Sequence, residues 1–355
     1  MSERSKKLSR AVSSIDGFQL WSTVEHPLVM RSRITSLNRA MKCGGIPGGM
    51  LGVLHGPSQG GKTLLLAELL YDAWRTGGWG LFADAECRAV DLRWFRAICG
   101  AIEEIAYFKP QTFELAISRI QEFRGKFRAA KKAKDVPENA FLVIGVDSIN
   151  RLTPATELDE ILEGKVAPRG YPLRALLTSK WLDKIIPTLE RDEVVVFVQR
   201  EGRKMDVKPG QKTWTLKGGS AIAYDAGWSI RVTAAGRQKC RDDDKGGALC
   251  GEKHSIELEK NSLGPHLNEI ANFYSSTGAE EGMPLGLDFA REVREETINR
   301  GFAVYKKGTG YLFRGEAVAE SKREYLAWIQ AEEDGQPRWV RLQGELDADE
   351  QVDAE

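Results

Sequence analysis

The chain has few cysteines and no long apolar run, and these absences exclude several classes of protein. Only five of its 355 residues are cysteine, at positions 43, 87, 99, 240 and 250. An odd number of scattered cysteines does not suit the disulfide framework of a small secreted protein. No apolar stretch reaches the roughly 18 residues of a membrane span, and no signal-peptide pattern opens the chain. We therefore expect a cytoplasmic protein with no membrane partner.

Charge of one sign is not in excess either. The chain contains 51 basic and 51 acidic residues, so its overall balance gives no argument for binding to nucleic acid. The charges are unevenly placed, however, because residues 344–355 contain six acids and no base. Such a composition is typical of a disordered, solvated segment, and we expect an acidic tail at residues 341–355.

Histidine and cysteine do not gather in a recognisable metal-binding pattern. The nearest candidate is Cys240, Cys250 and His254. Their spacing matches no common zinc motif and offers no obvious fourth ligand. A hairpin between two strands is the simpler interpretation of this segment, and a metal cluster remains the alternative.

Glycine is plentiful, and one glycine-rich segment carries a specific chemistry. It matches the phosphate-loop pattern G-x-x-x-x-G-K-[ST] in full, with Gly56, Pro57, Ser58, Gln59, Gly60, Gly61, Lys62 and Thr63. A strand is predicted before it at residues 50–55 and a helix after it at 63–76, which is the context that phosphate binding requires. Lys62 is expected to reach the β- and γ-phosphates of ATP, and the Thr63 hydroxyl to hold Mg²⁺. The alternative is a glycine-rich turn that binds nothing.

Two further strand ends supply carboxylates. An apolar run at residues 141–147 ends in Asp147, and another at 80–86 ends in Glu86. In open α/β sheets, ligands bind beyond the carboxyl ends of the strands. Asp147 is expected to support Mg²⁺ through water, and Glu86 to orient and deprotonate an attacking water. The alternatives are a strand-capping aspartate and an ordinary surface glutamate.

The order of predicted elements indicates the fold class. Strands at 50–55, 79–84, 104–108, 141–147 and 193–198 alternate with helices at 63–76, 91–99, 112–130 and 173–190. This alternation predicts an α/β fold with a mostly parallel twisted sheet and helices on both faces. Strands at 226–233, 254–260 and 266–274 follow at close spacing, so the sheet is expected to end antiparallel. Residues 276–340 predict a small C-terminal α/β domain, with helices at 287–299 and 320–333 and a hairpin at 302–313.

Four segments together resemble a known family. They are residues 34–63, residues 82–86 (FADAE), residues 143–158 (VIGVDSINRLTPATEL) and residues 217–232 (KGGSAIAYDAGWSIRV). In this order they resemble the RecA-type DNA strand-exchange recombinases, from about Ile34 to about Ile329. The divergent details look more like a phage-encoded member than a typical bacterial one. The resemblance implies a RecA-like P-loop NTPase core at residues 34–275 and an N-terminal arm at 1–33 that docks on a neighbouring protomer.

The resemblance also implies where DNA binds. Two long polar connections, at residues 157–172 and 200–219, lie where the family keeps its DNA loops. The second is rich in bases and contains an aromatic residue, which suits phosphate tracking with base stacking. The expected DNA-binding residues are Arg169, Arg174, Arg203, Lys204, Lys208, Lys212, Trp214, Lys217, Gly218 and Gly219. A solvated surface loop is the alternative for this segment.

The chain departs from the family pattern at three places near the nucleotide. RecA proteins end one strand in Asn-Gln, where the Gln senses the γ-phosphate, and the aligned pair here is Gln199-Arg200, so either residue is a candidate sensor. The family reaches across the protomer interface with two lysines, of which only Lys260 is present. Trp94 is the expected match for the aromatic residue that stacks on adenine, with a core aromatic as the alternative.

The expected function is that of an ATP-dependent recombinase, a DNA-dependent ATPase with ATP and Mg²⁺ as its cofactors. It would form filaments on single-stranded DNA, pair them with homologous double-stranded DNA and exchange strands in recombination and repair, associated with the nucleoid. Two alternatives stay open. One is a hexameric helicase ring built on the same core, and the other is an ATP-binding recombinase paralogue with weak turnover.

Overall fold

The computed structural model describes most of the chain. The described residues are 26–86, 92–98, 102–162, 171–203, 214–216, 221–239, 249–264, 270–278 and 284–354, with the backbone alone at the ends of several elements. The N-terminal arm expected at residues 1–33 is described only from residue 26, so its docking on a neighbour stays a prediction.

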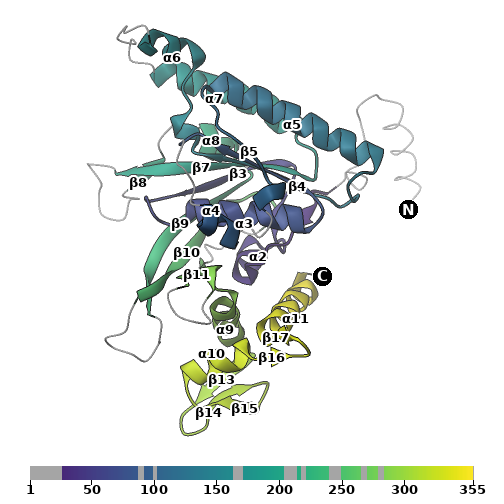
Figure 1. Cartoon of the computed structure of the whole chain (residues 1–355), viewed down its shortest axis with the longest axis vertical. Coiled ribbons are helices and arrows are strands. Elements are labelled where there is room, and N and C mark those ends of the chain that lie inside the picture. Colours follow the sequence, from purple (N-terminus) through teal and green to yellow (C-terminus); the bar gives the residue numbers. More distant parts are fainter. Residues whose placement is uncertain are drawn as a thin grey trace, which may run out of the picture.

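A large mixed sheet forms the centre of the molecule (Figure 1). Its strands are β3 (Met50–Gly56), β4 (Trp79–Asp84), β5 (Ala106–Phe108), β6 (Leu142–Asp147), β7 (Glu193–Arg203), β8 (Trp214–Leu216), β9 (Trp228–Lys239), β10 (Leu249–Asn261), β11 (Ile270–Thr277) and β12 (Leu285–Leu287). Their order is β12-β11-β10-β9-β3-β7-β6-β4-β5, and β8 pairs with the outer end of β7. The strands from β9 to β5 are parallel, and β10, β11 and β12 continue antiparallel. The predicted antiparallel end of the sheet is confirmed.

Helices cover both faces of this sheet. They are α2 (Thr35–Met41), α3 (Lys62–Arg75), α4 (Leu92–Ile98), α5 (Phe113–Ala133), α7 (Tyr171–Ile185) and α8 (Ala221–Asp225). Helix α6 (Ala155–Leu162) follows β6 in the chain and has no buried side chain among its described residues. Successive side chains of a strand point to opposite faces. Along β7, Val196 therefore joins the core with α3, and Phe197 joins the core with α5 and α7. The predicted α/β fold, with helices on both faces of the sheet, is thus confirmed. Because its central strands are parallel, their carboxyl ends lie at the same edge of the sheet.

A second, smaller core lies at the C-terminal end. It is built from α9 (Phe289–Asn299), β13 (Ala303–Lys306), β14 (Gly310–Phe313), β15 (Glu316–Ala319), α10 (Lys322–Gln330), β16 (Glu332–Glu333), β17 (Gln336–Pro337) and α11 (Arg338–Ala354). The predicted hairpin carries a third strand, β15, that the sequence pattern did not indicate. β12 pairs with β11 of the main sheet although it follows residue 276, so the exact domain boundary stays a prediction.

The expectation of a disordered acidic tail is wrong. Residues 341–354 continue helix α11, whose Leu342 and Leu346 are each 1% exposed in the C-terminal core. Two acids of this helix have basic partners: Asp347 lies 4.0 Å from Arg31, and Asp349 accepts a hydrogen bond from Arg300. Leu342 and Leu346, four residues apart, give the helix a buried apolar stripe. The excess of acids in residues 344–355 concealed this stripe in the sequence.

The N-terminal strap at residues 26–33 packs on its own core. Strand β1 (Val29–Met30) pairs antiparallel with β2 (Ile46–Pro47), and the Arg33 guanidinium donates two 2.7 Å hydrogen bonds to the buried carboxylate of Glu68. The Arg33 guanidinium also lies 3.9 Å from the ring centroid of Tyr71. These contacts place the last residues of the expected arm in the same protomer, against α3.

Both expected DNA loops contain more regular structure than predicted. Residues 157–162 belong to α6, and α7 begins at Tyr171, so the first connection is helical at both ends. In the second, β7 runs on to Arg203 and pairs antiparallel with β8, with Glu201 opposite Leu216 and Arg203 opposite Trp214. Loop length alone did not reveal this pairing, because β8 is only three residues long.

Candidate nucleotide-binding site

The glycine-rich segment joins β3 to α3 at the carboxyl end of the sheet. Its backbone needs glycine at two points, because Gly56 has φ 146° and Gly61 has φ 99°. A side chain at Gly56 would also collide with β9, since its Cβ would lie 2.0 Å from the carbonyl oxygen of Val232. These glycines let the loop pass close to β9 while its N–H groups stay available to phosphate.

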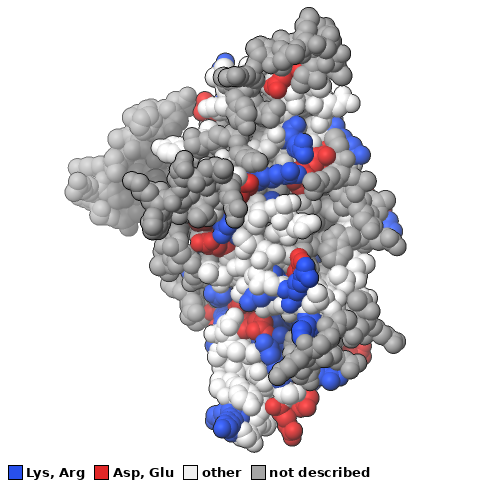
Figure 2. All heavy atoms as spheres, turned by 90° about the vertical axis from the view of Figure 1, so that its left-hand side faces the viewer, with Lys and Arg blue, Asp and Glu red and all other residues white. Residues whose placement is uncertain are grey.

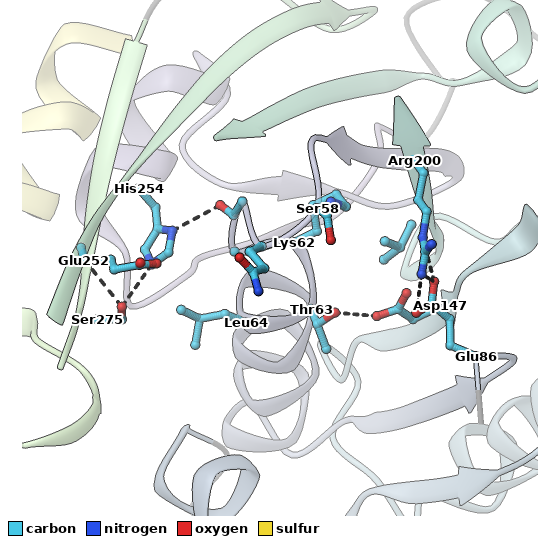
Figure 3. Close-up of a pocket in the computed structure, with 14 residues that line it drawn as sticks. Ser58, Lys62, Thr63, Leu64, Glu86, Asp147, Arg200, Glu252, His254 and Ser275 are labelled. Atoms are coloured by element: carbon cyan, nitrogen blue, oxygen red, sulfur yellow. Dashed lines mark hydrogen bonds and ion pairs between the residues drawn. The ribbon is translucent and has the colours of Figure 1, made fainter. Parts of the chain in front are cut away.

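A cavity of about 290 Å³ opens at this loop (Figure 3). The loop, the carboxyl ends of the central strands and two antiparallel strands line it. The lining residues are Ser58, Gln59, Gly60, Gly61, Lys62, Thr63, Leu64, Glu86, Asp147, Val198, Arg200, Glu252, His254 and Ser275. Six of the eight predicted phosphate-loop residues, both predicted carboxylates and one of the two sensor candidates therefore line one cavity, and Gly56 and Pro57 are joined to it by accepting hydrogen bonds from Lys62.

The side chain of Lys62 folds back on the first two residues of the loop. Its Nζ donates hydrogen bonds to the carbonyl oxygens of Gly56 at 3.1 Å and Pro57 at 2.5 Å. Burial lowers the pKa of Lys62, and the nearby carboxylate of Asp147 counteracts part of that effect. A phosphate in the cavity would offer the ammonium group a stronger, charged acceptor than these neutral carbonyls.

Thr63 and Asp147 form the part of the site suited to a divalent cation. The Thr63 hydroxyl donates to the Asp147 carboxylate at 2.5 Å, joining the first turn of α3 to the end of β6. Burial raises the pKa of Asp147, and the hydrogen bond from Thr63 works against that rise. Hydroxyl and carboxylate oxygens are the ligands that Mg²⁺ prefers, usually together with waters and substrate phosphates. These residues fit the predicted Mg²⁺, which would neutralise charge on the phosphates.

Glu86 lies across the cavity from the loop, just after β4. It accepts a 3.0 Å hydrogen bond from the Ser148 hydroxyl. It is also bound by Arg200, whose Nη2 lies 2.7 and 2.8 Å from the two carboxylate oxygens and whose Nε lies 3.0 Å from one of them. A carboxylate so placed can orient and deprotonate water, but here its lone pairs are shared with a guanidinium.

The structure separates the two sensor candidates. Arg200 and Val198 line the cavity, and Gln199 lies between them with its side chain on the opposite face of β7. Gln199 is fully buried there, beside His55 in the register of β3 and β7. Arg200 is therefore the residue of this pair that can reach a phosphate.

His254 is a site residue that the sequence analysis did not assign to the nucleotide. It is 3% exposed on β10, and its Nδ1 lies 3.1 Å from the carbonyl oxygen of Gly60 while its Nε2 lies 2.9 Å from the Ser275 hydroxyl. Burial lowers the pKa of His254, so the neutral ring with a proton on Nδ1 suits both contacts. His254 thereby connects β10 and β11 to the phosphate loop, and no local sequence signal links these segments.

Comparisons with known proteins agree with this fold and site. The family model described as the RecA N-terminal domain matches residues 22–277. The chain belongs to the RecA family. Among similar curated proteins, Protein RecA of Syntrophobacter fumaroxidans is 26% identical over 90% of this chain and 87% of its own length. Protein RecA of Methylococcus capsulatus is 26% identical over 81% and 74%, and that of Bordetella avium 26% over 92% and 87%. These relatives are bacterial and give the expected phage origin no support.

Two other residues expected at the nucleotide from the RecA resemblance are Lys260 and Trp94. Lys260 lies on β10 and donates a 2.5 Å hydrogen bond to the carbonyl oxygen of Tyr224, so its expected role across an interface stays a prediction. Trp94 lies in α4, but its side chain is outside the described part of the structure. Its stacking on adenine therefore also stays a prediction.

Only the base of the expected second DNA segment is described in this RecA-family chain. Arg169, Lys204, Lys208, Lys212, Lys217, Gly218 and Gly219 lie outside the described residues, as do the side chains of Arg174 and Arg203. Trp214 is described, and it is partly buried, with its ring 5.0 Å from the His55 ring and 5.2 Å from the Arg231 guanidinium. Basic and acidic side chains are interspersed over the described surface on the side where β8 lies (Figure 2).

A buried charged cluster connects this hairpin to the phosphate loop. His55, directly before Gly56, is 0% exposed, and its two ring nitrogens each lie 3.1 Å from a carboxylate, Glu201 on β7 and Glu259 on β10. Arg231 lies 2.7 Å from Glu201. Burial by itself lowers the pKa of His55, but the two carboxylates outweigh it and the pKa is raised. The sequence analysis missed this cluster because its members come from four distant strands.

Two other expectations concern a metal cluster and membrane-spanning helices. Within the residues that the structure describes, no set of three or more His, Cys, Asp or Glu side chains could hold a metal ion by itself. Cys250 is a buried free cysteine, and Cys240 is not described. Across the same residues, no helix has the length and apolar character needed to cross a membrane.

Proposed function

We propose that the protein is an ATP-dependent DNA recombinase that assembles on single-stranded DNA and exchanges strands with a homologous duplex. The observation that carries this proposal is the single cavity in which Lys62, the Thr63–Asp147 pair and Glu86 meet, in a chain of the RecA family. In this proposal the chain is a DNA-dependent ATPase that uses Mg²⁺.

Each site residue has a distinct role in the proposed reaction. The loop N–H groups and the Lys62 ammonium bind the β- and γ-phosphates, and Thr63 with Asp147 holds Mg²⁺ beside them. Glu86 accepts a proton from the attacking water, and Ser148 keeps its carboxylate oriented. The Arg200 side chain faces the terminal phosphate. Gly56 and Gly61 permit the loop conformation, and the side chains of Pro57, Ser58 and Gln59 are not needed for phosphate contact.

DNA binding is assigned to the segments that follow α6 and β7. Their described ends lie beyond the carboxyl edge of the sheet, as expected for a ligand surface of an α/β fold. The basic residues expected to contact phosphate are Arg169, Arg174, Arg203, Lys204, Lys208, Lys212 and Lys217, and Trp214 in β8 is the expected stacking residue.

One observation favours a second candidate, an ATP-binding paralogue with weak turnover. The bidentate pair between Arg200 and Glu86 occupies the carboxylate that hydrolysis requires. If this pair were permanent, the chain would bind ATP and hydrolyse it slowly.

Electron microscopy and an ATPase assay distinguish these functions. The full chain is incubated with single-stranded DNA and a slowly hydrolysed ATP analogue, imaged in negative stain, and assayed for ATP turnover with and without DNA. Helical filaments with DNA-stimulated turnover support the recombinase. Closed rings indicate a helicase. Absence of both an assembly and ATP turnover indicates the paralogue.

A further inference from the structure

Two strand ends bring opposite charges together inside the nucleotide cavity. Arg200 comes from β7 and Glu86 from the end of β4, and three hydrogen bonds of 2.7 to 3.0 Å join them. The Arg200 side chain keeps 33% of its surface exposed, against 9% for Glu86. The guanidinium therefore has space to move, while the carboxylate has little and is also held by Ser148.

The surroundings of Arg200 offer it a second partner. Lys62, the predicted ligand of the β- and γ-phosphates, lies close to Arg200. Burial is the main cause of the lowered pKa of Lys62, and the positive charge of Arg200 lowers it further. Two cations thus face one cavity (Figure 3). A γ-phosphate carries more charge than a carboxylate and offers three acceptor oxygens, so it competes well for a guanidinium. ADP has no such group.

We propose that Arg200 exchanges between Glu86 and the γ-phosphate of ATP. With ADP in the site, the guanidinium stays on Glu86 and occupies the carboxylate. With ATP, it moves to the γ-phosphate, so Glu86 is released while Ser148 still orients it. This inference rests on the proposed ATPase function and adds to it the residue that detects ATP.

The exchange makes the general base, the Glu86 carboxylate, available only when ATP is bound. The oxygen of the attacking water forms a bond to the γ-phosphorus, the bond from that phosphorus to the ADP oxygen breaks, and the proton of the water goes to the free Glu86 carboxylate. Once phosphate leaves, Arg200 returns to the carboxylate, and the proton passes to solvent. Because β7 continues from Arg200 into the β7–β8 hairpin, the same movement is placed to reach the expected DNA segment.

The test measures affinities for ADP and for the non-hydrolysable analogue AMP-PNP, each with Mg²⁺, by isothermal titration calorimetry on the full chain. The variants are Arg200→Gln, Glu86→Gln and the double variant, and Arg237→Gln is the control for loss of one charge, because Arg237 is exposed on β9. Loss of a charge-assisted contact with the γ-phosphate predicts roughly tenfold to hundredfold weaker AMP-PNP binding in Arg200→Gln. The ADP affinity should change less than about threefold, which also reports that the variant is folded.

The comparison within the Glu86→Gln background decides between exchange and a permanent pair. If Arg200 only neutralises Glu86, removing it from a chain that already lacks the carboxylate charge leaves AMP-PNP affinity unchanged, and the proposal is overturned. If Arg200 moves to the γ-phosphate, the double variant binds AMP-PNP at least tenfold more weakly than Glu86→Gln alone. Failure of the unmodified chain to bind either nucleotide would contradict the proposed function itself, whereas normal binding with no Arg200 effect contradicts the exchange alone.

Discussion

Lys62 and Glu86 face one cavity, and the proposed reaction gives them different steps. Replacing Glu86 by Gln keeps its shape and removes its basicity. We expect Glu86→Gln to retain ATP and DNA binding and to lose turnover by about 10²- to 10⁴-fold, the usual contribution of a general base. Steady-state phosphate release by the purified variant measures this, and hydrolysis at the unmodified rate would remove Glu86 from the mechanism.

Lys62→Ala should act earlier, on binding itself. The substitution deletes the ammonium that now donates to the Gly56 and Pro57 carbonyl oxygens, and with it a charge-assisted contact to the β- and γ-phosphates. Loss of about 1.5–3 kcal/mol of ATP binding is expected. Calorimetric titration with ATP checks this, and an unchanged affinity would place the phosphates elsewhere.

His55 predicts a pH dependence of stability. Its ring faces Glu201 and Glu259, with Arg231 bound to Glu201 and the Trp214 ring beside it. Because the pKa of His55 is raised in the folded chain, its stabilisation is complete below about pH 6.5, the usual pKa of histidine. The stabilisation is lost as pH rises through the raised value. His55→Gln should therefore differ most from the unmodified chain at low pH, by about 1–3 kcal/mol in free energy of unfolding.

Urea unfolding at several pH values between 6 and 9 tests this. The difference between the two chains should shrink with rising pH. A difference that stays constant across the range would show that His55 contributes by packing and not by charge.

At the scale of elements, the expected second DNA segment contains the β7–β8 hairpin, and its basic residues Lys208 and Lys212 lie between these two strands in the sequence. If these bases neutralise DNA phosphates, each contributes roughly −0.7 to the slope of log affinity against log salt for single-stranded DNA. Lys208→Ala and Lys212→Ala should each make the slope shallower by up to that amount, for every DNA sequence alike.

Fluorescence anisotropy at several salt concentrations measures the slope. Lys306→Ala is the matched control, because Lys306 is exposed on β13 in the C-terminal region. Equal slopes for all three variants and the unmodified chain would move the DNA site away from residues 200–219.

Helix α11 offers a prediction that follows from burial. Leu346 is 1% exposed in the C-terminal core, whereas Val340 on the same helix is 37% exposed. Leu346→Ala should lower the free energy of unfolding by about 2–5 kcal/mol, and Val340→Ala by less than about 0.5 kcal/mol. Chemical denaturation of both variants compares them. Equal, small effects would mean that residues 341–354 are a solvated tail after all.

The elements also show what the sequence could predict. The phosphate loop, Asp147 and Glu86 were predicted correctly as strand-end residues of one α/β sheet, because each follows a continuous apolar run. Helix α11 was missed because charge composition masked the buried pair Leu342 and Leu346. Contacts such as His254 with Gly60 could not be predicted, since they depend on strand order and register across 194 residues of separation.

At the scale of the whole molecule, the polar contacts between its two cores keep them together. Buried Glu292 on α9 accepts a 2.7 Å hydrogen bond from the backbone N–H of Ser36, and Arg39 on α2 lies 3.1 Å from Glu296. Burial raises the pKa of Glu292 well above its usual range. The main sheet with its helices and the C-terminal region thus belong to one connected structure.

Strand exchange is the measurement that tests the central claim most directly. The full chain, ATP and Mg²⁺ are incubated with circular single-stranded DNA and a linear duplex, and the products are separated by gel electrophoresis. We expect joint molecules and nicked circles with a homologous duplex, none with a heterologous one, and none with Lys62→Ala. Absence of joint molecules with the homologous duplex, from a chain that binds ATP and DNA, would contradict this claim.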